Sequence, residues 1–192
     1  MRILLTLSML LAALMLSGCG YNTMQTTDEN VTASWSEVLN QYQRRADLVP
    51  NLVNVVKGYA SHEKEVLEAV TVARSRVGSI QATPELVNDA QAFAKFQAAQ
   101  DGLSSALSRL LVVSENYPTL KSNENFMALQ TQLEGTENRI AVERRRYNEV
   151  VQEYNVRIRQ FPASLVAGFS GFKEKQFFTA KEGAAEAPQV KF

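Results

Sequence analysis

The chain has very little of the two residues that most often carry metal, redox or nucleophilic chemistry. It contains one cysteine, Cys19, and one histidine, His62, in 192 residues. A single cysteine excludes an internal disulfide, a thiolate cluster and a CxxC redox pair, and a single histidine excludes a site with two histidine ligands. Neither sign of charge is in excess, because 20 Lys and Arg stand against 20 Asp and Glu. Nucleic-acid-binding domains are usually strongly basic, so we expect no nucleic-acid partner.

Catalytic motifs are equally scarce. His62-Glu63 begins like the zinc-hydrolase motif HExxH, but Val66 stands where the second histidine belongs. The chain has no Ser-His-Asp order, nucleophile elbow or phosphate-binding loop. We therefore expect no metal, no cofactor and no enzymatic activity.

The N-terminus carries a short apolar run, from Ile3 to Leu16, behind Met1-Arg2. The run is shorter than the ~20 residues that span a bilayer, and it is typical of a secretory signal. The segment Leu16–Cys19 resembles the bacterial lipobox, which predicts cleavage before Cys19 and acylation of its thiol. Ordinary secretion and an uncleaved anchor are the alternatives. Two or more acyl chains would hold the protein stably on a membrane.

The predicted organisation has four parts. Residues 1–18 are a lipoprotein signal peptide, 19–27 an acylated linker, 28–178 a helical bundle, and 179–192 a disordered tail rich in Ala and Glu. Gly20 is not the Asp that typically retains lipoproteins at the inner membrane of Gram-negative bacteria. The periplasmic face of the outer membrane is therefore favoured, and the inner membrane is the alternative.

Helical periodicity dominates the rest of the chain. From Val31 to Val77 the pattern steps by four and three residues without interruption, and only Arg45 and Glu63 are not apolar or aromatic in it. A second stripe follows Thr83-Pro84, which read as an N-cap and first helical residue, and a third follows the cap candidates Ser122–Asn125. No strand alternation is present. The sequence predicts an all-α fold, an elongated antiparallel bundle of three long helices with a short C-terminal helix or turn at the end distal to the membrane.

A length argument suggests an interaction surface. With three helices, residues 28–43 would extend beyond the second helix on the side near the membrane. The apolar stripe there, which includes Trp35, Leu39 and Tyr42, would lack one partner. Because an uncovered apolar stripe usually marks a contact surface, we expect protein binding or self-association through this part of the first helix.

Polar residues at two places suggest a ligand-binding alternative. Pro50 removes a helical hydrogen bond from the carbonyl of Ala46, so the bundle or water must supply another donor. Asp47 and Asn51 flank this expected kink, which is either a recognition site or purely architectural. Tyr147-Asn148 and Tyr154-Asn155 repeat at seven residues and share a helix face. Asn148 and Asn155 would either form an amide ladder for a peptide or glycan, or bridge helices beside two core tyrosines.

Long motifs connect the chain to a known family. From Val38 it reads VLNQYQRRADLVPNLVNVVKGYASHEKEVLEAVTVAR, and further motifs follow in order: Glu115–Asn123, Glu137–Ile140, Arg145–Asn148, Tyr154-Asn155, Phe161-Pro162 and Gly171–Lys173. Over roughly residues 18–178 the chain strongly resembles the LemA family. The resemblance implies a bacterial envelope protein with an antiparallel helical bundle behind an N-terminal membrane anchor. It implies no assigned activity, and the lipobox departs from the transmembrane anchor of many members.

The sequence thus predicts a lipid-anchored scaffold or adaptor of the cell envelope that acts through protein–protein interaction. The alternative is an envelope module that binds peptides or cell-wall fragments.

Overall fold

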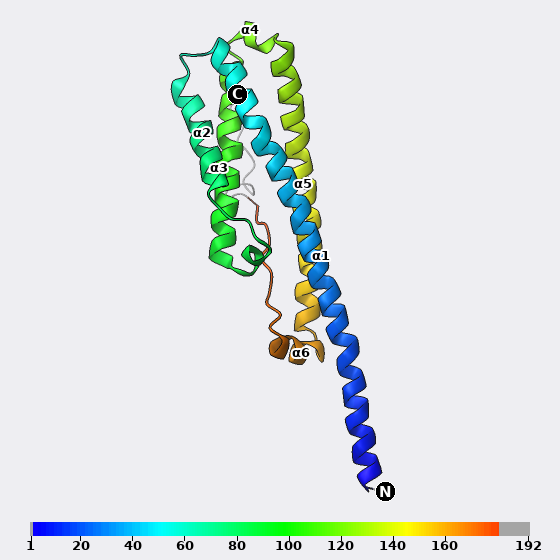
Figure 1. Cartoon of the computed structure of the whole chain (residues 1–192). Coiled ribbons are helices and arrows are strands. Elements are labelled where there is room, and N and C mark those ends of the chain that lie inside the picture. Colours follow the sequence, from blue (N-terminus) through cyan, green and yellow to red (C-terminus); the bar gives the residue numbers. More distant parts are fainter. Residues whose placement is uncertain (1, 181–192) are drawn as a thin grey trace, which may run out of the picture.

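The computed structural model describes the backbone of residues 2–180 and the side chains of residues 20–180. This part of the chain is all-α and contains no strand, which confirms the predicted fold class. Its elements are α1 (Arg2–Tyr59), α2 (Lys64–Gly78), the 3-10 helix η1 (Pro84–Asn88), α3 (Ala90–Ser114), α4 (Pro118–Lys121), α5 (Glu124–Arg159) and α6 (Ala163–Ser170). The helices form an elongated bundle (Figure 1).

The first predicted helix is interrupted, so the expectation of one helix through residue 77 is wrong. The chain leaves α1 at Tyr59 and re-enters a helix at Lys64, although the apolar stripe continues across the break. Ala60 is fully buried at the turn, and Glu63 accepts a hydrogen bond from the Tyr117 hydroxyl at 2.9 Å. This contact gives a polar stripe residue a partner that a continuous helix would not provide.

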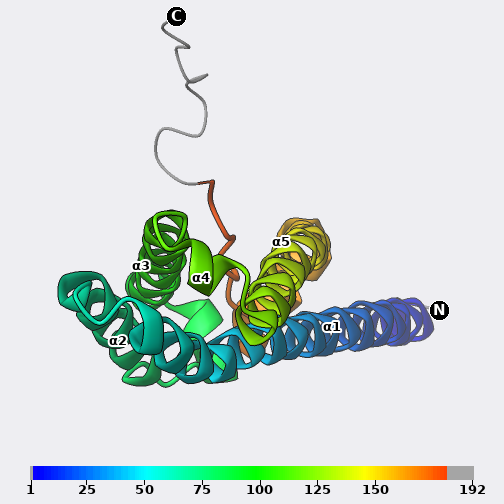
Figure 2. The same cartoon turned by 90° about the horizontal axis from the view of Figure 1, so that it is seen from above.

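The additional reversal changes which helices are neighbours. α1 packs mainly against α5, and α2 packs against α3 (Figures 1 and 2). α5 runs back along α1, so α6 lies at the end of the bundle nearest the N-terminus and contacts both α1 and α5. The expectation that the short C-terminal helix is distal to the N-terminal segment is therefore wrong, because it assumed one reversal fewer.

The core has two parts. The half away from the N-terminus is built around Val49, Leu103 and Leu133, and the half nearer the N-terminus around Trp35, Phe93 and Tyr147. The uncovered stripe predicted on the first helix does not exist in this form: the exposed fractions of Trp35 and Tyr42 are 1% and 3%. Phe96 of α3 packs on both rings, and Trp35 is also covered by Tyr147 of α5 and by Phe178 after α6.

The start of α1 also differs from expectation. Residues 20–27 are helical, with Met24 and Thr27 buried, so they belong to the bundle and do not form a free linker. Cys19, the predicted signal peptide before it and most of the predicted tail (residues 181–192) lie outside the described side chains. Among the described residues, none of the helices combines the length and apolarity required to cross a membrane.

Pro50 lies inside α1, as expected, and the freed carbonyl has a partner. The Arg74 Nε–H of α2 donates to the Ala46 oxygen at 3.0 Å. This confirms that the bundle supplies the donor that the helix loses at a proline. The turn of α1 that ends at Pro50 is therefore also a point of attachment for α2.

Candidate functional site

The most distinctive feature of the bundle is an extended segment that lies against the helices. Residues 172–180, named here the C-terminal segment, follow α6 without forming a helix or strand. Gly171, which ends α6, has a φ of 77°, a left-handed conformation that favours glycine, and from there the chain runs back along the bundle. The segment lies between α3 and α5 (Figures 1 and 2). We call this space, with α1 as its floor, the α3/α5 groove.

Two asparagines of α5 hold the segment by its main chain. Asn148 Nδ2 donates to the Phe178 carbonyl and Asn148 Oδ1 accepts from the Phe178 N–H, both at 2.9 Å. Asn155 makes the same pair of bonds with the carbonyl and N–H of Lys175, also at 2.9 Å. Each side-chain amide thus reproduces the pairing of a neighbouring β-strand. Such bonds recognise an extended backbone whatever side chains it carries.

Further contacts extend the attachment to the other wall. The Tyr147 hydroxyl donates to the Gln176 carbonyl at 3.0 Å, and the Gln176 N–H donates to the Val87 carbonyl of η1 at 2.9 Å. Gln97 Nε2 of α3 donates to the Thr179 carbonyl at 3.0 Å. The segment is therefore bonded to both sides of the groove.

The side chains of the segment are fixed as well. The Phe178 ring is 6% exposed and packs with Trp35 and Phe93, with ring centroids 6.0 and 4.9 Å apart. The Lys175 ammonium lies 2.7 Å from an Asp28 carboxylate oxygen of α1. Phe178 and Lys175 are also the residues whose backbones the two asparagines bind, so side-chain and main-chain anchoring coincide.

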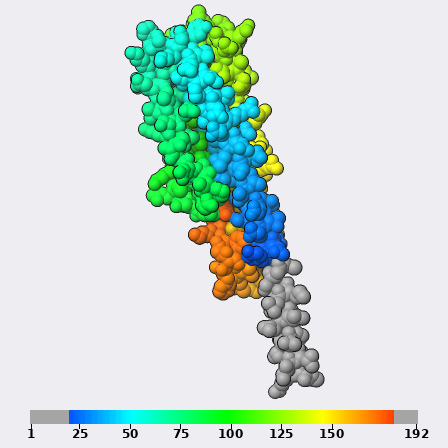
Figure 3. All heavy atoms as spheres, in the orientation of Figure 1, coloured from blue at the N-terminus to red at the C-terminus, as the bar shows by residue number. Residues whose placement is uncertain are grey.

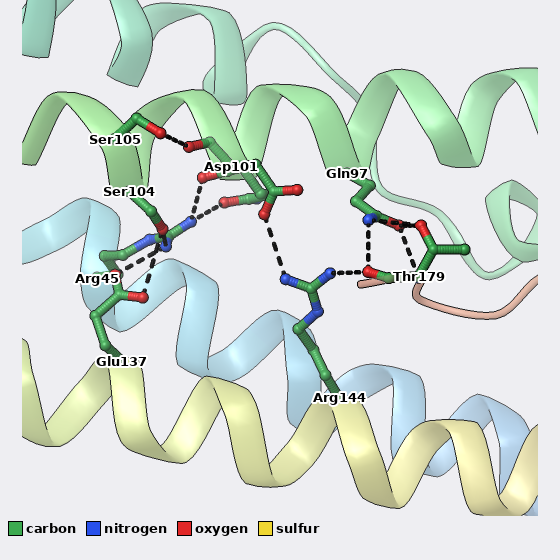
Figure 4. A network of polar contacts seen from close by, with 9 residues as sticks. Arg45, Gln97, Asp101, Ser104, Ser105, Glu137, Arg144 and Thr179 are labelled. Atoms are coloured by element: carbon green, nitrogen blue, oxygen red, sulfur yellow. Dashed lines mark hydrogen bonds and ion pairs between the residues drawn. The ribbon is translucent and has the colours of Figure 1, made fainter. Parts of the chain in front are cut away.

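Beyond the segment, a buried arginine links three helices. Arg45 of α1 is 1% exposed, and its guanidinium donates to Glu137 of α5 at 2.9 Å and to Ser104 of α3 at 2.6 Å (Figure 4). It also donates to the side-chain and backbone oxygens of Gln100. This accounts for the charged residue in the apolar stripe, since a buried charge needs a partner and satisfied hydrogen bonds.

A second arginine connects this network to the C-terminal segment. Arg144 of α5 lies 3.3 Å from Asp101 of α3, and its guanidinium lies over the Phe178 ring, 4.5 Å from the centroid (Figure 4). It also contacts the Thr179 carbonyl at 3.5 Å. The Arg144–Asp101 ion pair thus crosses the groove from wall to wall, and Arg45 reaches both walls from its floor.

The half of the groove near Arg45 is open. A cavity of about 550 Å³ lies there between α3 and α5, lined by residues from α1, α3 and α5. Leu107, Leu111 and Leu133 supply its apolar part, and Ser108 and Asn138 are among its polar groups. Within the described part of the chain, two buried atoms that border this cavity have no hydrogen-bond partner, the Tyr42 hydroxyl and Arg45 Nε.

Burial also shifts the tyrosines that line the groove. Desolvation raises the pKa of Tyr42 to about 12, with the nearby Arg144 and Arg45 acting in the opposite direction. Desolvation raises the pKa of Tyr147, and it raises the pKa of Tyr154 with a further contribution from Asp28. All three tyrosines are therefore neutral at physiological pH and act as hydrogen-bond donors or apolar rings.

The four polar residues of the ligand hypothesis do not meet. Asp47 and Asn51 are exposed on α1, where Asp47 accepts from Gln43 at 2.7 Å. The Arg45–Glu137 ion pair shows that Glu137 is the residue of α5 nearest the level of Asp47. At ~1.5 Å per residue, Asn148 and Asn155 lie roughly 16 and 27 Å from Glu137 along α5, on the side away from Asn51. The two asparagines do form a ladder for a peptide, but the peptide is the chain's own.

The other predicted contact residues are not free surface either. Trp35 and Tyr42 are in the core, and Leu39 is half-buried, bordering an open cavity of about 750 Å³ between α1 and α2. No sequence motif placed Arg45 and the C-terminal segment in one site. A charged residue inside an apolar stripe was the signal for Arg45; the segment gave none beyond its aromatic residues.

Among residues 20–180, no group of three or more His, Cys, Asp and Glu side chains is placed to hold a metal ion.

Comparison with known proteins finds similarity over most of the bundle. The model of the LemA family matches residues 34–192, which include α2 to α6 and the C-terminal part of α1. The chain belongs to the LemA family. Similar proteins include the magnetosome proteins MamQ 2 and MamQ 1 of Paramagnetospirillum magneticum, each 30% identical over 186 residues, 88% of this chain and 68% of the relative. Protein LemA of Metamycoplasma hominis is 25% identical over 157 residues, 81% of this chain and 67% of the relative.

Proposed function

We propose that this LemA family protein is a membrane-tethered adaptor of the cell envelope whose α3/α5 groove binds an extended segment of a partner protein. The observation that carries the proposal is the main-chain pairing of Asn148 and Asn155 with residues 175 and 178. One half of the groove already holds a peptide in extended form. The adjoining half is open and has the same walls.

The chemistry of the open half suits the same kind of ligand. Leu107, Leu111 and Leu133 on its walls suit apolar side chains of a bound segment. The Asn138 amide, which is exposed and lines this cavity, offers both a donor and an acceptor to an extended backbone. This favours the peptide form of the ligand-binding alternative, merged with the adaptor role, over cell-wall fragments.

In-cell photo-crosslinking tests the groove. A benzoylphenylalanine at Ser108, which lines the open half, is compared with one at Arg109, an exposed neighbour about 100° around α3. We expect crosslinks from position 108 that map to one short segment of another protein, and none of these from position 109. Equal crosslinking at both positions, or crosslinks from position 108 only to this chain's own residues after 180, would contradict the proposal.

The tether is proposed from the sequence. The lipobox-like Leu16–Cys19 and the family resemblance support an acylated Cys19 in the envelope, with the periplasmic face of the outer membrane favoured and the inner membrane as the alternative. Replacing Cys19 with Ala should abolish labelling by an alkyne fatty acid and leave unprocessed precursor. Unchanged labelling and mobility would refute lipidation without affecting the groove.

A further inference from the structure

An exposed apolar surface occupies the end of the bundle nearest the N-terminus. Phe161, Leu165 and Phe169 are 82%, 60% and 95% exposed, although each is a large apolar side chain. We call these three residues the α6 patch. Leu165 and Phe169 are four residues apart and share one face of α6, whereas Ala167, about 200° away from each, is buried against the bundle. The helix therefore packs with one face and leaves its apolar opposite face uncovered.

The position of the patch along the bundle is set by a ring contact. Phe172, just after α6, packs edge-on against Tyr21 of α1 with centroids 5.8 Å apart. Tyr21 follows Cys19 by two residues, about 3 Å along a helix. α6 therefore lies within a few ångströms of the level of Tyr21, near the first residues of α1 whose side chains are described. Figure 3 shows this part of α1 and the residues of α6 side by side.

The apolar run Ile3–Leu16 leads away from the same end. Whether the chain is cut before Cys19 and acylated there or keeps this run, its hydrophobic anchor begins at the level of the α6 patch. Phenylalanine and leucine on one face are the residues with which interfacial helices enter the boundary between headgroups and acyl chains. Lys173 and Arg157 are exposed in the neighbouring sequence and suit contact with lipid phosphates.

We infer that the α6 patch is a lipid-contact surface, which lies in the interface of the membrane that holds the N-terminus. This inference rests on the proposed tether but concerns a separate contact. Two attachments, the N-terminal anchor and α6, fix the tilt of the rod, whereas a single anchor would leave it free to swing. The tether raises the effective concentration of α6 at the bilayer, so a short helix suffices.

Tryptophan quenching in the full chain tests the contact. The variants Phe169→Trp and, as a matched control, Val112→Trp, which is 69% exposed on α3, are reconstituted in phosphatidylethanolamine and phosphatidylglycerol vesicles with brominated acyl chains. Trp35 is buried and contributes the same background to both. We expect the emission of Phe169→Trp to shift to shorter wavelength and be quenched by the brominated lipid, and that of Val112→Trp to be unchanged.

Flotation of the same samples separates the outcomes. Protein that floats while Phe169→Trp is no more quenched than Val112→Trp would overturn the lipid contact and leave the tether intact. Protein that does not float would contradict both the tether and the lipid contact. A blue shift that requires no lipid but grows with protein concentration, with a doubled sedimentation mass, would assign the patch to a second copy of the chain and overturn the inference.

Discussion

The asparagine pairs make the attachment of the C-terminal segment measurable. Asn148→Leu removes two hydrogen bonds to Phe178 while keeping most of the side-chain volume. At about 1 kcal/mol net per hydrogen bond, we expect a loss of about 2 kcal/mol in the free energy that holds the segment in place. This corresponds to a roughly thirtyfold larger equilibrium constant for local opening of the segment, at constant global stability. The ion pairs across the groove lie outside the segment and remain.

Native-state hydrogen exchange is the appropriate assay, because the Phe178 amide is itself the donor to Asn148. Its exchange should accelerate by about that factor in Asn148→Leu, while the amides of the buried part of α5 keep their rates. Gln152→Leu, an exposed change on the same helix, is the control. If the Phe178 amide exchanges equally in wild type and Asn148→Leu, the amide pair contributes nothing and the argument for main-chain recognition fails.

A charge variant sharpens the same test. In Asn148→Asp the carboxylate still accepts from the Phe178 N–H, but at neutral pH it has no proton to donate to the Phe178 carbonyl. Protonation of the new carboxyl restores both bonds, whereas the Arg144 guanidinium one turn earlier on α5 favours the charged form, so its pKa should stay in the acidic range. Attachment of the segment should be weak at neutral pH and recover as the pH falls through that pKa. Equal attachment at both pH values would contradict a donating role of Asn148.

Three further predictions concern the framework. Glu137→Ala leaves the buried Arg45 without its ion-pair partner and should lower the free energy of unfolding in urea by about 3 kcal/mol. The double variant Arg45→Met/Glu137→Leu should lose less stability than Arg45→Met and Glu137→Leu lose in sum, because the two side chains are coupled. Strict additivity of these losses would contradict the coupling. Arg74→Met should cost about 1 kcal/mol through the loss of its bond to the Ala46 carbonyl, and an unchanged urea midpoint would mean that water replaces it fully. Because the folded-state pKa of Tyr42 is about 12 against an ordinary 10, its contribution to stability is complete below pH 10 and is lost between pH 10 and 12, a change of roughly 2–3 kcal/mol. Tyr42→Phe should flatten that decline in alkaline denaturation, and an unaltered slope would refute the assignment.

The features that could be predicted from the sequence are those with local causes. Apolar periodicity identified the helical segments, and Asn123 caps α5, as its position before the third stripe suggested. The need for a donor to the Ala46 carbonyl follows from Pro50 alone, without knowledge of the donor. The start of α3 was less predictable: Thr83-Pro84 begins the 3-10 helix η1, and Asp89 caps α3 instead. Thr83 and Asp89 are both short polar residues that suit an N-cap, and only the packing of the folded chain decides which of them caps α3.

The sequence by itself determined that this LemA family chain is helical, where most of its helices lie, and which residues are apolar enough to form the core. It could not determine the number of chain reversals, because the stripe keeps its spacing across residues 60–63, and the tertiary contact of Glu63 with Tyr117 accompanies the turn there. That reversal decided the functional features: it covered Trp35, placed α6 at the end of the bundle nearest the N-terminus, and set α3 and α5 as walls of a groove. Periodicity is a property of neighbouring residues, whereas a groove arises from contacts between residues far apart in the chain, and these exist only in the folded bundle.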